Sequence, residues 1–264
     1  MKNGFLILTA AGIIAATGCG HTSDEIRVPS AEKIYNEAVS RWKGHKIFGL
    51  IPYHDNERAI ELFQEVLDKF PNTKYAFLSE IGIADVNFGR EEYDEAQTRY
   101  RNFYTLRPAN ELAAYAFFRS GMCFEKLASS YDRDLTPIKN AMYEYKSLIG
   151  KYPASEYASE AKERLKEISE ILAKSEFYVG KFYYRRKNYQ SALNRFKNIL
   201  SDYPDYSGRE KVLYYLYLTY INLGEKQEAI KYSEILLNNY PDSKYRKKFA
   251  EIQSVSNNTD STKP

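Results

Sequence analysis

An alanine followed twelve residues later by a proline occurs five times along the chain. An aromatic residue stands four positions after four of these alanines, and an apolar residue stands seven positions after all five. Offsets of 0, 4 and 7 lie on one face of an α-helix, and proline cannot continue a helix. The pattern predicts five amphipathic helices that pack at a small alanine and stop before a proline. The pairs are Ala59/Pro71, Ala96/Pro108, Ala141/Pro153, Ala192/Pro204 and Ala229/Pro241.

A second amphipathic segment precedes each of these alanines. In the fourth unit, Gly180 stands twelve residues before Ala192, and residues 187–189 form a turn between the two segments. Each unit therefore resembles the tetratricopeptide repeat, a helix–turn–helix of 34 residues. We expect an all-α solenoid of five such repeats, with a concave groove lined by the first helix of each pair.

Three departures from a plain repeat divide the solenoid. Residues 43–55 add a loop to the first unit, and residues 129–137 add an insert to the third. Residues 155–186 contain no proline and one glycine, and their apolar positions keep helical spacing. They predict one long helix that joins repeats 3 and 4. The N-terminal half then covers residues 30–154 and the C-terminal half residues 155–250.

The N-terminus has the pattern of a lipoprotein leader. An apolar run at 5–16 is too short to span a membrane, which takes about 20 residues, but has the length of a secretory core segment. Thr17, Gly18 and Cys19 follow as in a bacterial lipobox, although Ala16 stands where that motif prefers leucine. We expect a signal peptide over 1–18, lipidation of Cys19, a tether over 19–29 and a disordered tail over 251–264. The alternative is an ordinary signal peptide with a chance cysteine.

Composition and motifs argue against several functions. The formal net charge of +3 is too even for a nucleic-acid-binding protein. The phosphate-loop, nucleophile-elbow and zinc-protease motifs are absent from the sequence, so we expect no enzyme, cofactor or metal. His45 and His54 share the first-unit loop but form only a weak metal motif. Cys123 lies in an apolar helical stretch and is expected in the core.

Repeat register assigns candidate groove residues, which are aromatic and apolar in the N-terminal half and become basic in the C-terminal half. An aromatic groove of this kind suits an extended peptide with apolar side chains. The N-terminal candidates are Tyr35, Trp42, Leu78, Ile81, Asp85, Phe88, Tyr115, Phe118 and Met122, and the C-terminal candidates are Phe177, Lys181, Tyr184 and Arg185.

Residues 132–205 narrow the comparison to one family. They contain an Asp-Arg-Asp insert before Thr136-Pro137, the segment YPASEY at 152–157, LAKSEFYVGKFYY at 172–184 and ALNRF at 192–196. This combination resembles the BamD family, the tetratricopeptide lipoproteins of the machine that assembles outer-membrane β-barrels. The resemblance implies a scaffold at the outer membrane, lipid-anchored and facing the periplasm.

The resemblance also implies partners. The C-terminal repeats of this family dock on the last POTRA domain of the barrel-forming, BamA-type subunit, which would place Arg195 near the contact, with Lys181, Arg185 and Arg186 beside it. The N-terminal repeats are expected to receive the C-terminal signal of unfolded outer-membrane β-barrel proteins, whose terminal aromatic residue would suit Tyr35, Trp42, Phe88 and Tyr115. Accessory lipoproteins of the complex are further expected partners.

A second hypothesis is a periplasmic repeat protein that coordinates cell-wall functions with the Tol–Pal system. Such a protein would carry an N-terminal coiled-coil trimerisation segment. The sequence has no such pattern before Ser30, which favours the first hypothesis.

Overall fold

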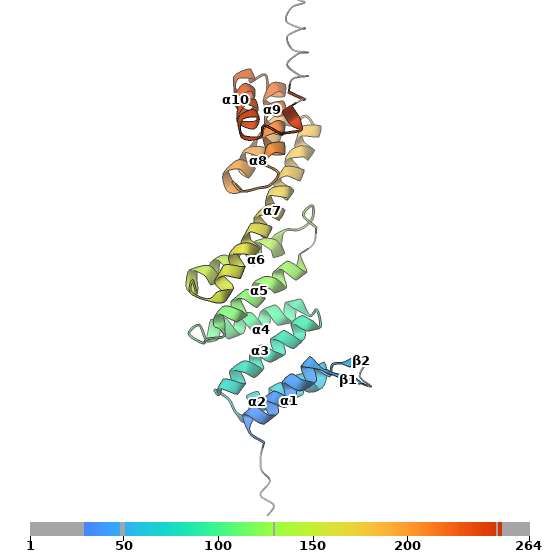
Figure 1. Ribbon diagram of the computed structural model, residues 1–264, viewed down its shortest axis with the longest axis vertical. Helices are drawn as coiled ribbons and strands as arrows, with labels where there is room; N and C mark the ends of the chain where they lie inside the picture. The colour runs from blue at the N-terminus through green and yellow to red at the C-terminus, as the bar shows by residue number, and fades with distance from the viewer. Residues whose placement is uncertain (1–28, 48–50, 129, 247, 250–264) are drawn as a thin grey trace, which may run out of the picture.

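The computed structural model describes residues 29–47, 51–128, 130–246 and 248–249. Within these ranges, ten α-helices form five successive pairs that stack into an elongated solenoid (Figure 1). This confirms the predicted all-α repeat fold. The first helices of the pairs are α1 (Ala31–Lys43), α3 (Lys74–Gly89), α5 (Ala113–Leu127), α7 (Glu156–Arg185) and α9 (Arg209–Leu223). The second helices are α2 (Asn56–Lys69), α4 (Tyr93–Leu106), α6 (Thr136–Lys151), α8 (Tyr189–Asp202) and α10 (Lys226–Asn239).

The alanine–proline signal sets the ends and the packing of the second helices. Each of these helices ends two residues before its proline, as α2 does at Lys69 before Pro71. Proline disfavours the helical conformation in the residue that precedes it, so the helix stops there. All five alanines of the repeat are completely buried, which lets a neighbouring helix approach closely.

Glycines on the first helices admit the aromatic rings that follow these alanines. A Cβ atom added to Gly180 in α7 would lie 2.6 Å from the ring of Phe196 in α8. Gly121 in α5 has the same relation to Tyr145 in α6, at 2.5 Å. Both rings are fully buried, so neither can move aside at low cost. The glycine is therefore required by ring packing within the helix pair.

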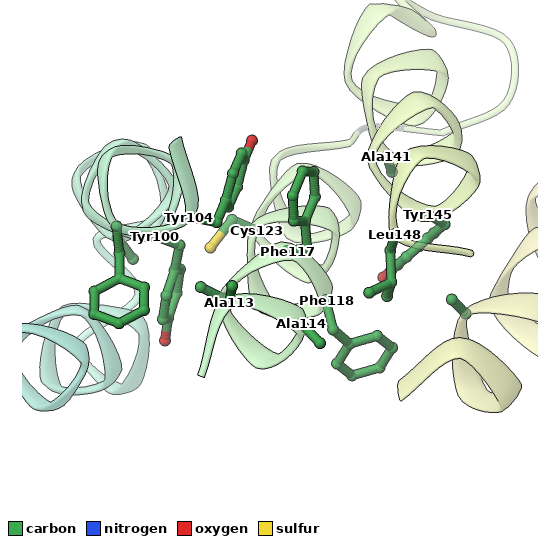
Figure 2. Close-up of a cluster of buried hydrophobic side chains, with 14 of the residues drawn as sticks. Tyr100, Tyr104, Ala113, Ala114, Phe117, Phe118, Cys123, Ala141, Tyr145 and Leu148 are labelled. Carbon is green, nitrogen blue, oxygen red and sulfur yellow. The ribbon is translucent and has the colours of Figure 1, made fainter. Parts of the chain in front are cut away.

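The core consists of three clusters along the solenoid. The first lies between α1, α2 and one face of α3, and the central one extends from α3 to Leu172 in α7. The third begins at Ala173 in α7 and continues to Phe249. Figure 2 shows the central cluster, where Phe117 and Phe118 lie between Tyr104 and Tyr145. Cys123 is also fully buried there, as predicted, and burial raises the pKa of its thiol to about 12.

Helix α7 belongs to two of these clusters. Its 30 residues correspond to about 45 Å, and it connects the lower and upper stacks in Figure 1. The long joining helix predicted from residues 155–186 is thus present as the first helix of the fourth pair. The two cores separate within α7, between Leu172 and Ala173, and not at its N-terminal end.

The first-unit loop contains more structure than the sequence suggested. Strands β1 (His45–Ile47) and β2 (Ile51–Tyr53) pair antiparallel, with His45 opposite Tyr53 and Ile47 opposite Ile51. Apolar or aromatic residues at 47, 48, 50, 51 and 53 make the segment suitable for a short hairpin. The hairpin projects from the side of the solenoid near α1 (Figure 1).

The predicted leader and tail lie largely outside the described residues. This applies to the signal peptide over 1–18, to Cys19, to the tether up to residue 28 and to the tail over 251–264. Among the described residues, none of the helices combines the length and the apolar character needed to cross a bilayer.

Candidate functional site

The predicted groove residues of the N-terminal half fall into two groups. Tyr35, Trp42, Leu78, Phe88 and Tyr115 are partly buried and keep some exposed surface. Met122 is also partly buried. The other three candidates belong to the interior: Ile81, Asp85 and Phe118 are 5%, 9% and 4% exposed. A peptide would not reach these side chains, because they face the interior between helix pairs.

The exposed group is held in place by ring contacts. Tyr35 packs against Phe63 and Tyr75, with centroids 5.7 Å and 5.6 Å away. The indole nitrogen of Trp42 lies over Gly89 of the next first helix. Aromatic rings held in this way offer apolar contact area at little entropic cost, which suits a recognition surface.

A buried polar cluster lies between α3, α4 and α5. Asp85 Oδ1 accepts hydrogen bonds from the hydroxyls of Tyr100, at 2.5 Å, and Tyr115, at 2.7 Å. Arg119 donates from Nε to the Tyr100 hydroxyl, at 3.1 Å, and its Nη2 lies 3.4 Å from Asp85. The guanidinium carbon also lies 3.9 Å from the ring centroid of Phe88. The cluster joins three helices of two repeats and fixes Phe88 and Tyr115 on the candidate surface.

Burial decides the protonation behaviour of this cluster. It raises the pKa of Asp85 above its ordinary value, against the opposing effects of Arg119 and the two tyrosine hydroxyls. It also raises the pKa values of Tyr100 and Tyr115, and the charge of Asp85 adds to both shifts. Every group of the cluster has a partner, so the arrangement holds these side chains in position.

Two more tyrosine–carboxylate pairs occur in the same half. The hydroxyl of Tyr104 lies 3.0 Å from both oxygens of Glu144. The hydroxyl of Tyr145 donates a short hydrogen bond to Glu125. Burial raises the pKa values of both carboxyl groups. Hydrogen bonds of this kind offset the cost of burying a carboxylate, so the N-terminal half couples its helices through polar contacts as well as rings.

The predicted partner-binding residues of the C-terminal half do not form one patch. Arg195 in α8 lies 3.0 Å from both carboxylate oxygens of Glu176 in α7. Lys181 lines a cavity next to α9. Because Glu176 and Lys181 are five positions apart, they are separated by about 140° around the helix. Arg185 and Arg186 are exposed at the C-terminal end of α7.

Possible metal ligands are few in the described part of the chain. No group of three His, Cys, Asp or Glu side chains there is placed to hold an ion. The Nδ1 atom of His54 lies 2.8 Å from the carbonyl oxygen of Trp42 and donates to it. This contact anchors the C-terminal end of the hairpin to α1.

Comparison with known proteins identifies the family. The family model YfiO, described as "Outer membrane lipoprotein", matches residues 50–235. The chain belongs to the YfiO family. Membership associates the protein with the outer membrane, and it agrees with the resemblance found in residues 132–205.

Curated relatives of this YfiO-family chain share one printed name. "Outer membrane protein assembly factor BamD" of Rickettsia prowazekii (strain Madrid E) is 28% identical over 84% of this chain and 85% of its own length. The protein of the same name from Neisseria meningitidis serogroup A is 27% identical over 82% of this chain and 81% of its own.

Solved structures similar to this YfiO-family chain are remote. The TPR2AB domain of yeast Sti1 in a pHSP90 complex has a TM-score of 0.46 and 14% identity, over 81% of this chain and 78% of that one. A thermophilic TPR protein of Thermus thermophilus has a TM-score of 0.36 and 14% identity, over 84% of this chain and 98% of that one. Since these scores are low, the fold assignment depends on the helix pairs described above.

Three residues of the Asp85 cluster and of the cavity next to α9 were not among the predicted site residues. Arg119 organises the Asp85 cluster, and Lys174 and Lys211 line the cavity with Lys181. Arg119 had a signal in the sequence, since it is the one charged residue in the apolar stretch 112–124. Lys174 and Lys211 had none, because lysines on helix surfaces are common and their approach depends on tertiary packing.

Proposed function

We propose that the protein is an assembly factor for outer-membrane β-barrel proteins. It acts as a lipid-anchored periplasmic scaffold that binds the POTRA-bearing barrel subunit and receives unfolded barrel proteins for insertion. The observation that carries this proposal is the match to the YfiO family over residues 50–235. The shared name of relatives aligned over most of both chains supports it.

Depletion in the native host tests the function as a whole. Folded outer-membrane barrels, measured by their heat-modifiable migration in gels, are expected to decrease as the protein is lost. Unchanged barrels together with a cell-division or envelope defect would contradict the proposal and favour a role beside the Tol–Pal system.

The N-terminal half is the proposed receiver of the unfolded substrate. Tyr35, Trp42, Leu78, Phe88 and Tyr115 supply partly exposed apolar surface on successive first helices. Such a surface suits the terminal aromatic residue of an extended segment. Ile81 and Phe118 support it from the core and are not part of the proposed contact.

The C-terminal half is the proposed docking site for the barrel subunit, with Arg195 at the contact and Arg186 near it. Arg185, four positions after Lys181, lies on the Lys181 side of α7 and would extend the docking site there. Arg195→Glu is expected to weaken the capture of the POTRA-bearing subunit while the helical circular dichroism spectrum stays unchanged. The exposed Lys162 in α7 provides a control, because Lys162→Glu makes the same charge reversal elsewhere.

Because Arg195 also forms an ion pair with Glu176, one more variant is needed to separate a direct contact from an effect on local structure. The exchange Arg195→Glu with Glu176→Arg restores the internal pair but keeps the reversed charge at position 195. Loss of capture in both variants supports a direct contact. Recovery of capture in the exchange variant would show that Arg195 acts only through the local structure.

The lipid anchor is proposed at Cys19. Cys19→Ser is expected to abolish incorporation of radiolabelled palmitate, whereas Cys123→Ser, at a fully buried thiol, is expected to leave it unchanged. Equal labelling of Cys19→Ser and the wild type would contradict this assignment.

A further inference from the structure

A cavity of about 580 Å³ opens between α7 and α9. The loop that connects α5 to α6 lies beside the middle of α7 (Figure 1) and contributes Tyr131 to the cavity wall. The Tyr131 ring meets that of Tyr178 edge to face, with centroids 6.1 Å apart. The insert of the third repeat therefore closes one side of the cavity.

Three lysines line this cavity without a carboxylate partner. In the part of the chain that the structure describes, Lys174, Lys181 and Lys211 form no ion pair. Lys174 Nζ lies 4.1 Å from the ring centroid of Tyr131, and Lys211 Nζ lies 4.7 Å from that of Phe177. Burial lowers the pKa of Lys211, and the charges of Lys181, Lys244 and Lys174 lower it further. Positive charge is thus concentrated here and not neutralised.

One acidic residue, Glu170, also lines the cavity, so the wall carries three positive charges against one negative charge. Glu170 accepts hydrogen bonds from the backbone nitrogen and the hydroxyl of Ser207, both at 2.7 Å. Each carboxylate oxygen therefore has a partner on the loop between α8 and α9. Glu170 keeps its charge but is oriented toward this loop, and an anion from outside the chain would offset the remaining excess of two positive charges.

The spacing of the lysines favours an extended peptide over a compact anion. Lys174 and Lys181 are seven residues apart on α7, which places them on one face about 10 Å apart. In an extended chain, side chains on one face are two or four residues apart, at about 7 and 13 Å, which brackets this distance. The rings of Tyr131 and the exposed Tyr178 beside these lysines offer contact area for an apolar side chain. A single phosphate would fill neither the length nor the volume of the site.

We propose that this cavity binds an extended acidic peptide segment, with its carboxylates at Lys174, Lys181 and Lys211 and an apolar or aromatic side chain against Tyr131 and Tyr178. The site is separate from the substrate surface of the N-terminal half. In this proposal Lys181 binds the peptide ligand and takes no part in the contact at Arg195.

Fluorescence anisotropy with the purified full-length chain tests the proposal. The probe is a labelled seven-residue peptide with two glutamates four positions apart and a phenylalanine midway between them, so that all three side chains lie on one face of the extended chain. Binding is expected to weaken about tenfold when glutamines replace the glutamates, and about tenfold in the double variant Lys174→Gln/Lys211→Gln, because two ion pairs are lost in each case. Lys162→Gln, an exposed position on the same helix, is expected to bind like the wild type.

Three results would overturn the proposal. Equal affinity for the glutamate and glutamine peptides would show that charge is not recognised. Equal losses in Lys162→Gln and the double variant would show non-specific attraction. Competition by inorganic phosphate at the concentration of the peptide would identify a phosphate site. None of these results bears on the proposed assembly function, which depletion tests separately.

Discussion

The two halves of the solenoid bury tyrosine in different ways. In the N-terminal half, Tyr100, Tyr104 and Tyr145 donate hydrogen bonds to carboxylates of other helices. In the described C-terminal half, the buried polar residues are serines and one threonine, and tyrosines pack against other rings. The buried Tyr217, for example, meets the ring of Phe249 edge to face, with centroids 4.6 Å apart. Hydrogen bonds require a specific geometry, whereas ring contacts tolerate small shifts, so we expect the N-terminal half to be the more sensitive to polar substitutions.

The largest effect is expected where the two cores share α7. Ser169→Pro removes a helical hydrogen bond and introduces a steric clash near the boundary, which costs about 3 kcal/mol or more. Trp42, the only tryptophan, reports on the N-terminal half, while circular dichroism reports on both. Urea unfolding followed by the two signals should give separate transitions in this variant.

The control for this experiment is Glu156→Pro. Glu156 is the first residue of α7, and Ser155 before it has an extended backbone, with φ of −71° and ψ of 146°. Proline is well tolerated at this helix position. Coincident transitions in Ser169→Pro at the wild-type midpoint would show that the halves do not depend on a continuous α7.

The buried Asp85 cluster is tested by Asp85→Ala. This variant is expected to lower the free energy of unfolding by about 3 kcal/mol, because it leaves the charge of Arg119 and two tyrosine hydroxyls without their acceptor in a buried site. The matched change in the C-terminal half, Glu176→Ala, breaks a more exposed ion pair and is expected to cost less than about 1 kcal/mol. Urea midpoints of the two variants measure the contrast. Equal costs would remove the proposed difference between the halves.

Gly180→Ala tests ring packing in the C-terminal half. The added methyl group meets the buried ring of Phe196, and we expect a loss of about 2 kcal/mol in the free energy of unfolding. Gly150 in α6 has open space around it, so Gly150→Ala should instead stabilise the protein by about 0.5–1 kcal/mol. A stabilised Gly180→Ala variant would show that α7 and α8 can shift to admit the methyl group, although the Phe196 ring between them is buried.

The smallest effect is a pH dependence. Burial raises the folded-state pKa of Glu144, so the folded state binds its proton more tightly than the unfolded state. The contribution of Glu144 to stability is therefore greatest below its ordinary pKa of 4.5 and declines as the pH rises through the folded value. Relative to Glu144→Gln, the wild type should gain about 1 kcal/mol or less on acidification.

Urea unfolding at a series of pH values measures this difference. Glu111→Gln removes the same charge at an exposed position and serves as the control. A wild type that gains stability relative to Glu144→Gln as the pH rises would contradict the assigned direction of the pKa shift.

Sequence spacing predicted the helix pairs, the long α7 and the burial of Cys123, because these depend on periodicity within the chain. It predicted the candidate surface less well. Ile81 and Phe118 occupy first-helix positions that face the next repeat, and spacing alone does not separate these from groove positions. The pairing of Arg195 in α8 with Glu176 in α7, and the approach of Lys211 to Lys174, depend on how neighbouring helices cross. The hairpin was missed because its strands are only three residues long.

Helix α7 also limits how the protein can change in length. It carries both cores, so inserting one residue between Leu172 and Ala173 would rotate one half against the other by about 100°. A change of seven residues, two turns, or of eleven residues, three turns, restores the orientation to within about 20° and moves the halves apart by about 10 or 17 Å. The proposed substrate surface and the proposed docking surface are thus set at a fixed angle, and their separation can vary only by nearly whole helical turns.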